Sequence, residues 1–231
     1  MLAYLPPMID NRTRIIDAAA RVYAAHGYRG ATTRLIAEEA GVNEVTLFRH
    51  FGSKSALLDA MIAECVDLSR RSLPTQPKDP ATELARWVTG HMQQITMKRD
   101  LLRQVMREVG EHPQHIECAG KGPAEAAEQL REYVVRLRRN GWLVTDTNDA
   151  ASAIDVSAAV TMLMTALFVD AMDRDMMPHL FHTPADEAPR AYVRLFLRSL
   201  GAREELLASA STPAPAGSRT EPATALPSLD S

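Results

Sequence analysis

Apolar side chains recur every three or four residues along most of the chain, the spacing that gathers them on one face of an α-helix. Residues 12–26 show this spacing first, and Gly27 follows them. Further stripes cover 84–95, 101–109, 124–139, about 149–172 and about 186–200. No segment alternates apolar and polar residues for long enough to predict a β-strand. The pattern therefore predicts an all-α protein with about nine helices.

The segment between residues 32 and 66 carries the start and stop signals of three helices. Thr32 or Thr33 offers an N-cap for a short helix through residue 40, and Gly41 ends that helix. Asn43 caps a second short helix, and Ser53 caps a longer one. Isolated helices below about 12 residues are marginal in water. We therefore expect the two short helices to be held by packing of their apolar residues onto the 12–26 stripe.

The second short helix would then present a polar outer face. With Leu47 and Phe51 turned inward, Val45, Thr46 and Arg49 point outward, together with His50. In a helix-turn-helix, the first helix crosses the DNA backbone and the second enters the major groove. Val45 and Thr46 are small enough for close approach to a thymine methyl, and Arg49 reaches guanine or phosphate. The alternative is a small helical core whose polar faces are merely solvated.

The charge distribution favours DNA as the partner of this segment. The chain has 231 residues, of which 46% are hydrophobic and 24% charged, and its net charge is −3. Residues 10–54 hold seven basic and five acidic side chains, so they carry +2 and the rest of the chain carries −5. An electric field of this sense orients the N-terminal segment towards a polyanion.

The same residues carry a family resemblance. Residues 14–58 read RIIDAAARVYAAHGYRGATTRLIAEEAGVNEVTLFRHFGSKSALL. This stretch resembles the DNA-binding domain of TetR-family transcriptional regulators, in its Thr-Thr pair, its Ala-Gly-Val turn, its Thr-Leu-aromatic core and its closing Ser-Lys. Beyond about residue 60 the resemblance is limited to length and helical pattern. It implies a sequence-specific, double-stranded-DNA-binding regulator, more often a repressor than an activator.

The resemblance also implies roles for individual residues. Thr33 and Lys54 match positions that clamp phosphates, and Arg34, Val45, Thr46 and Arg49 match positions that read bases or the adjacent backbone. His50 and Phe48 match backbone-contacting positions, although Phe48 lacks the usual hydroxyl and would only pack. Glu44 either accepts a hydrogen bond from cytosine N4 or favours the N-terminus of its helix.

In that family, a helical C-terminal domain forms the homodimer and holds an inducer pocket. The stripes of the last two predicted helices, 149–172 and 186–200, suit a dimer interface, although they equally suit an intrachain core. Two symmetric reading heads would match a palindromic operator. An apolar or amphipathic small-molecule inducer is expected, because aromatic residues and methionine adapt to apolar ligands. Candidate lining residues are Trp87, His91, Met92, Met106, Trp142, Met164 and Phe168.

A metal-responsive regulator is the alternative reading. His112, His115 and Cys118 are spaced three residues apart, and imidazole and thiolate bind zinc or copper. However, Pro113 interrupts a helix at this point, and the spacing fits no strong zinc pattern, so no metal or other cofactor is assigned. The sequence holds no phosphate-binding glycine loop or nucleophile elbow, so we expect no enzyme.

The predicted domain organisation is a DNA-binding domain over 1–54, a regulatory and dimerisation bundle over 55–207, and a disordered tail over 208–231. The tail consists of Ser, Thr, Ala and Pro without periodicity. The N-terminus lacks the pattern of a signal peptide, and the apolar run 150–172 contains Asp155 and ends in acidic residues, which favours a core helix over a membrane span. Two cysteines provide no disulfide framework. A cytoplasmic protein is therefore expected.

Overall fold

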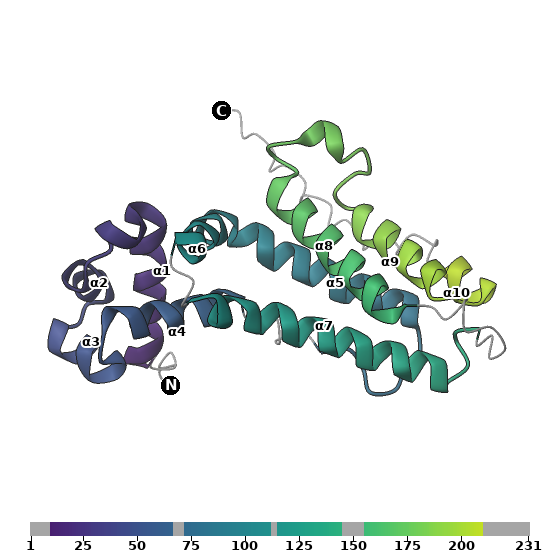
Figure 1. Ribbon diagram of the computed structural model, residues 1–231, viewed down its shortest axis with the longest axis horizontal. Helices are drawn as coiled ribbons and strands as arrows, with labels where there is room; N and C mark the ends of the chain where they lie inside the picture. The colour runs from purple at the N-terminus through teal and green to yellow at the C-terminus, as the bar shows by residue number, and fades with distance from the viewer. Residues whose placement is uncertain (1–9, 67–71, 112–114, 145–154, 210–231) are drawn as a thin grey trace, which may run out of the picture.

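The computed structural model describes residues 10–66, 72–111, 115–144 and 155–209. Helices α1 to α4 form a unit at one end, and the remaining helices form a longer bundle beside it (Figure 1). The described residues contain no strand, only an isolated antiparallel bridge between Leu143 and Ala202. The all-α prediction is confirmed. The helices are α1 Asn11–Gly30, α2 Thr33–Ala40, α3 Glu44–Phe51, α4 Lys54–Val66, α5 Pro80–Met97, α6 Arg99–Glu111, α7 Ile116–Arg139, α8 Val156–Asp173, α9 Ala188–Ser199 and α10 Glu204–Ser209.

Helices α2, α3 and α4 begin where the sequence predicts, whereas α1 continues past the expected end at Gly27 to Gly30. Gly27 adopts φ 65° and interrupts the helical backbone within α1. Thr32 caps α2 by accepting from the Leu35 amide at 3.2 Å, and Gly41 ends α2 with φ 64°, a conformation that glycine adopts without steric cost. Asn43 caps α3, and Ser53 Oγ accepts from the Ala56 amide at the start of α4. These capping predictions are confirmed.

Two elements differ from the prediction. Helix α7 begins at Ile116 and not at residue 124. Pro123 therefore lies inside the helix, on its exposed side, while the neighbouring Gly122 is buried. Packing of α7 along α4 therefore outweighs the helix-breaking tendency of the proline. Helix α10 is a tenth helix in the described part of the chain; its six residues are too few for a periodic pattern, and Leu206 anchors it with 1% exposure.

The described residues form two hydrophobic cores. The N-terminal core gathers apolar residues of α1, α2 and α3 with Leu57, Leu58, Met61 and Ile62 of α4. The larger core gathers residues of α5, α7, α8, α9 and α10. Because the inner face of α4 packs with the N-terminal core, the unit that holds α3 reaches past residue 54, where the sequence places the domain boundary.

Helix α8 is part of the larger bundle and packs on α5, α7 and α9. Of the described helices, it is the one whose 18 residues are long and apolar enough to cross a membrane, a test that the core helix of a globular protein also passes. Only 39% of that span is buried. The expected residues 149–154 of this helix lie outside the described residues, and so do residues 210–231 of the expected disordered tail. The first two residues of that tail, 208 and 209, belong to α10, so the expectation of disorder is wrong for them.

Replacing Leu47 by alanine tests how α3 is held. Leu47 is fully buried, so Leu47→Ala should lower the free energy of unfolding by about 2–5 kcal/mol through lost burial and the cavity left behind. Val45 on the same helix is 76% exposed, and Val45→Ala is the matched control. Urea denaturation followed by circular dichroism measures both. Equal, small effects would show that the α3 packing described above is wrong.

Candidate nucleic-acid interface

The outer surface of the N-terminal unit is formed by α2 and α3, joined by a three-residue turn. Asn43 Oδ1 accepts from both the amide and the hydroxyl of Thr46, each at 2.7 Å, so the first turn of α3 is satisfied before any ligand binds. Arg14 of α1 donates to the Ala40 carbonyl at the end of α2, at 2.7 Å. The backbone between the two helices is therefore fixed from both sides.

Helix α3 is amphipathic, with one face packed and the other open. Leu47 is fully buried, and Val42 and Phe51 pack against the same core. Val45 is 76% exposed, and Glu44, Arg49 and His50 are exposed beside it. The outer face combines a carboxylate, an aliphatic group, a guanidinium and an imidazole. These are groups that read base edges or contact phosphates in the major groove.

Phe48 departs from the expectation that it only packs, because its side chain is 43% exposed. It lies on the outer side of α3 with Val45, where an apolar ring can contact a thymine methyl. Thr46 is only half-exposed, and its hydroxyl is already engaged with Asn43. Thr46 therefore offers its methyl group at the surface and takes part in the N-cap of α3. Its hydroxyl proton is already used in the bond to Asn43.

The predicted residues of α2 have partners within the unit. Arg34 Nε lies 3.1 Å from Glu38 Oε1 on the same helix and remains 82% exposed, so this ion pair is solvated and easily exchanged for a phosphate. Thr33 Oγ1 donates to Glu44 Oε1 at 2.5 Å, which links the beginnings of α2 and α3. The residue spacing does not predict the contact between Thr33 and Glu44, because the two side chains are 11 positions apart in the sequence.

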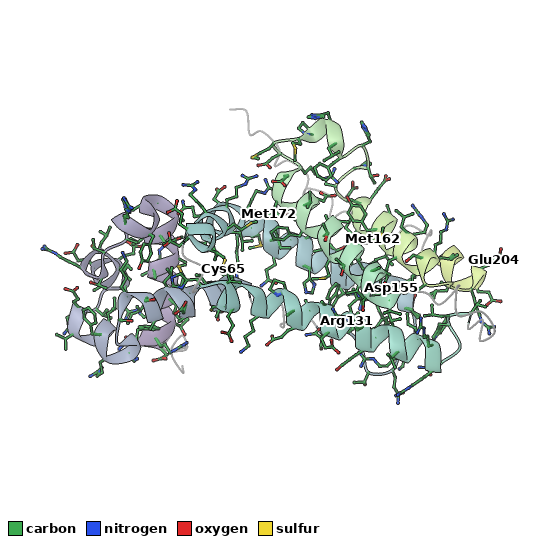
Figure 2. The ribbon with its side chains drawn as sticks, in the orientation of Figure 1. Cys65, Arg131, Asp155, Met162, Met172 and Glu204 are labelled. Carbon is green, nitrogen blue, oxygen red and sulfur yellow. The ribbon has the colours of Figure 1, made fainter. Side chains whose placement is uncertain are left out.

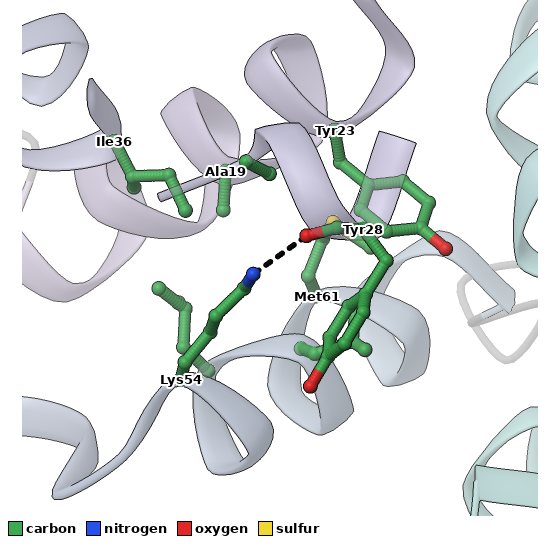
Figure 3. Close-up of a pocket in the computed structure, with 9 residues that line it drawn as sticks. Ala19, Tyr23, Tyr28, Ile36, Lys54 and Met61 are labelled. Atoms are coloured by element: carbon green, nitrogen blue, oxygen red, sulfur yellow. Dashed lines mark hydrogen bonds between the residues drawn. The ribbon is translucent and has the colours of Figure 1, made fainter. Parts of the chain in front are cut away.

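Lys54, at the start of α4, lies over the ring of Tyr28 with its ammonium 4.2 Å from the ring centroid (Figure 3). Its Nζ also donates to the Tyr28 carbonyl at 2.6 Å. Burial lowers the pKa of Lys54, and the negative charge of Glu108 opposes that shift. The ammonium thus ties α4 to the end of α1. A lysine has three N–H donors, so two remain for a phosphate oxygen.

Most of the predicted pocket residues lie in or against the larger core, and one does not. On α5, Trp87, His91 and Met92 are buried, and the Trp87 and His91 rings are in contact, with centroids 3.8 Å apart and planes tilted by 36°. His91 Nδ1 donates to the Trp87 carbonyl at 2.8 Å. The partly buried side chains that pack against the same core include Trp142, Met164 and Phe168.

Met106 is the exception, and the inclusion of this residue in a core pocket is wrong. Its side chain is 54% exposed. The buried residues of α6 are Leu102, Val105 and Glu108, spaced three apart, which turns the next position towards solvent. The sequence pattern does not distinguish Val105 from Met106 as the inward residue, because both fit a helical stripe.

The structure gives no support to a metal centre in the part of the chain that it describes. His115 Nδ1 donates to Asp59 Oδ1 at 2.7 Å, and Cys118 Sγ donates to the Asp59 carbonyl at 3.0 Å, so both side chains attach the start of α7 to α4. His112 lies outside the described residues. Among the described ones, no group of three His, Cys, Asp or Glu is placed to hold a metal ion.

Comparison with known proteins agrees with this geometry. Residues 15–61 match the model of the family described as bacterial regulatory proteins, tetR family. YvkB of Bacillus subtilis (strain 168), an HTH-type transcriptional regulator, is 27% identical over 153 residues, which are 66% of this chain and 80% of YvkB. The tetracycline repressor protein class D of Escherichia coli is 43% identical over 54 residues, 23% of this chain and 25% of that repressor.

A solved structure shares the overall fold. SmeT, the repressor of the Stenotrophomonas maltophilia multidrug efflux pump SmeDEF, superposes with a TM-score of 0.63 at 19% identity, over 89% of this chain and 97% of SmeT. A helix-turn-helix on a helical bundle, with these relatives, defines a DNA-binding transcriptional regulator and not an enzyme. Residues 15–61 therefore form a DNA-binding domain of the tetR family.

Substitution of Arg49 and Lys54 should separate base reading from phosphate contact. If Arg49 reads a base, Arg49→Ala should weaken binding to an operator selected from random DNA by about 1–3 kcal/mol and relax the preference at one base pair. Lys54→Met should weaken binding to all sequences alike and lower the salt slope by about one, because it removes one phosphate contact. Fluorescence anisotropy over a series of salt concentrations measures both. An unchanged salt slope for Lys54→Met would show that the ammonium only ties α4 to Tyr28.

Proposed function

We propose that this regulator is a repressor that binds a palindromic operator as a homodimer and is released by an apolar or amphipathic small molecule. The observation that carries the proposal is the exposed outer face of α3, held rigidly from behind by Leu47. Thr33, Arg34, Glu44, Val45, Thr46, Phe48, Arg49, His50 and Lys54 form the proposed DNA-binding surface. Relatives named as repressors, such as the class D tetracycline repressor, match over this part of the chain and support the direction of control. Its place of action would be the cytoplasm, where its DNA lies.

The outer side of α8 and α9 supports a second copy of the chain as partner. Met162, whose side chain is labelled on α8 in Figure 2, is 71% exposed, and Leu195 of α9 is 62% exposed. Both line a hollow between the two helices with Ala166 and Phe196. Exposed apolar surface of this kind is typical of interfaces. Dimers are typical of the family, and two identical heads recognise a two-fold symmetric operator.

A buried polar cluster fixes α8 and α9 relative to each other beneath that surface. Asp170 is 1% exposed and accepts from Arg174 Nε at 2.6 Å and from the Tyr192 hydroxyl at 2.6 Å. Burial and the Asp170 carboxylate raise the pKa of Tyr192 to about 12, so its hydroxyl stays protonated as a donor at neutral pH. The pair of helices is therefore prepared as a rigid face before dimerisation.

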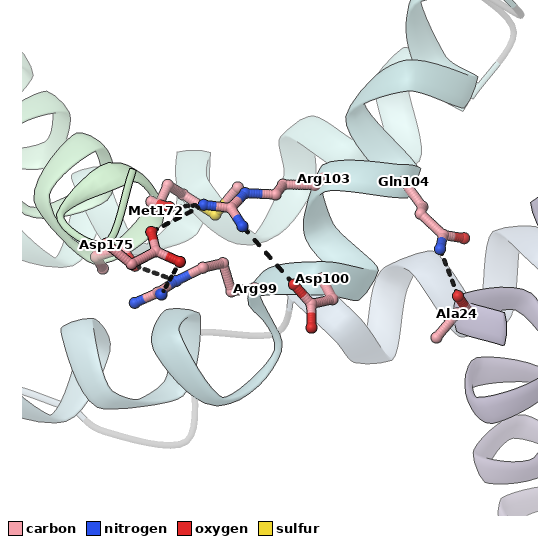
Figure 4. Close-up of polar contacts among 8 residues, drawn as sticks. Ala24, Arg99, Asp100, Arg103, Gln104, Met172 and Asp175 are labelled. Carbon is pink, nitrogen blue, oxygen red and sulfur yellow. Dashed lines mark hydrogen bonds and ion pairs between the residues drawn. The ribbon is translucent and has the colours of Figure 1, made fainter. Parts of the chain in front are cut away.

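Helix α6 connects the α8 end of the bundle with α1 of the DNA-binding unit (Figure 4). At one end, Arg99 pairs with Asp175 at 2.7 Å and donates to the Ala171 carbonyl at 2.9 Å, while Arg103 pairs with Asp175 at 3.1 Å. Further along α6, Gln104 Nε2 donates to the Ala24 carbonyl of α1 at 2.5 Å. A displacement of α6 by an inducer in the bundle would move α1, and with it the position of α3.

The composition of the larger core supports the proposed class of inducer. Trp87, Met92, Met164 and Phe168 offer large or polarizable apolar surface around the buried His91. Such surroundings suit an apolar or amphipathic molecule with few polar groups.

Selection from random duplex DNA, combined with an interface variant, tests the repressor model. The wild-type protein should enrich a palindrome. Met162→Glu should yield a monomer by light scattering and lose most affinity for that palindrome, because a charge replaces an apolar group at the interface. Met97 is 86% exposed on α5, and Met97→Glu is the matched control that should remain dimeric. A dimeric Met162→Glu protein would contradict the assigned interface.

Replacing Asp175 tests the proposed connection between the bundle and α1 through α6. Asp175→Asn removes the carboxylate that both arginines contact, so the reading heads should be less firmly positioned. We expect the variant to lose about two- to fivefold in operator affinity and to tolerate altered half-site spacing better than the wild type. Asp100, which is 91% exposed and lies 3.7 Å from Arg103, provides the control Asp100→Asn. Unchanged spacing dependence in Asp175→Asn would disprove this connection.

A further inference from the structure

Thr33 and Glu44 meet on the outer surface of the DNA-binding unit. Thr33 is the first residue of α2, Glu44 is the first residue of α3, and Thr33 Oγ1 donates to Glu44 Oε1 at 2.5 Å. Glu44 is exposed, while Thr33 is half-buried. The contact therefore lies on the surface that DNA would cover and occupies the hydroxyl assigned to a phosphate.

A hydroxyl has one proton to donate. While Thr33 donates it to Glu44, a DNA phosphate cannot receive it. The carboxylate also repels the phosphate directly, since like charges interact within a screening length of about 8 Å at physiological ionic strength. Before the DNA backbone can bind Thr33, it therefore has to displace Glu44.

The other acidic residues of α2 are arranged differently. Glu38 pairs with Arg34 at 3.1 Å, and Glu39 pairs with Arg21 at 2.8 Å. In both contacts the partner is a cation, so the negative charge is compensated locally. The partner of Glu44 in the Thr33 contact is a neutral hydroxyl, which leaves the charge of this carboxylate uncompensated by that contact.

We propose that Glu44 is a specificity-determining residue that competes with the DNA backbone for the Thr33 hydroxyl and is released onto a cytosine amino group in the operator. The proposal rests on the proposed function, because it takes Thr33 as a phosphate contact and α3 as the reading helix. Non-specific complexes depend on phosphate contacts, so displacement of Glu44 brings them no compensating contact. In the operator, the displaced carboxylate accepts from cytosine N4 in the major groove. Glu44 thus weakens binding to random DNA more than binding to the operator.

The first measurement compares the affinity of the full-length wild type and Glu44→Gln for random-sequence duplex DNA at fixed salt concentration. Glu44→Gln should bind random DNA about two- to fivefold more tightly, the size expected for one exposed charge interaction. In a parallel selection, its enrichment of one cytosine per half-site should weaken, because the neutral amide oxygen of Gln is a weaker acceptor for cytosine N4 than the carboxylate. Glu39→Gln changes the net charge equally without involving Thr33, and it should bind random DNA with a smaller gain.

The second measurement repeats the comparison in a Thr33→Val background. If Glu44 competes for the hydroxyl, Glu44→Gln should strengthen random binding less when the hydroxyl is absent. An equal gain in both backgrounds would reduce Glu44 to simple charge repulsion and overturn the proposal. No gain in random binding, or a gain matched by Glu39→Gln, would overturn it as well. Unfolding curves of all variants identify any loss that comes from misfolding.

Failure of the proposed function gives a different result. If the wild type enriches no sequence at all, the operator-binding repressor is contradicted, while the random-DNA comparison still tests the Thr33–Glu44 competition. If the wild type enriches a palindrome but Glu44→Gln changes neither random affinity nor the cytosine preference, only the role of Glu44 is rejected.

Discussion

The burial of Leu47 is the constraint on which the DNA-binding surface depends. Helices α2 and α3 have eight residues each, too few to be stable alone in water. Their geometry is therefore set by the core behind them, and the side-chain caps of Thr32 and Asn43 fix where each begins. A helix held in this way can present an exposed face of polar and apolar side chains without losing its position. Function and stability are thus assigned to opposite sides of the same eight residues.

The polar contacts of this surface are weak enough to be exchanged. Arg34 is paired with Glu38 in solvent, and Thr33 with Glu44, so the free protein satisfies its own groups before DNA arrives. In the proposed complex each such contact would be broken on binding, which would lower affinity for every sequence that offers no replacement. Lys54 differs, because its ammonium also donates a hydrogen bond to the Tyr28 carbonyl and so ties α4 to α1.

The sequence predicted the elements whose signals are local. Caps at Thr32, Asn43 and Ser53 and the breaks at glycines depend on residues a few positions apart, and all are found in the structure. The contacts between Lys54 and Tyr28 could not be predicted, since these residues are 26 positions apart. The expectation that Met106 lines a core pocket fails for another reason. The packing of α6 sets which way Met106 points, and helical periodicity alone does not determine that orientation. Which residues touch DNA or an inducer stays a prediction from the pattern and the family.

In the proposed mechanism the two ends of the protein depend on each other. Helices α8 and α9 would set the symmetry of the dimer, and α6 would transmit the position of the bundle to α1. The central claim of this account is that α3 of each protomer lies in the major groove. Methylation interference with dimethyl sulfate on the selected operator tests this claim most directly, because the reagent methylates guanine N7 in the major groove and adenine N3 in the minor groove. The account predicts loss of binding when guanines of both half-sites are methylated at N7. Interference confined to adenine N3 would contradict it, because the contacts would then lie in the minor groove.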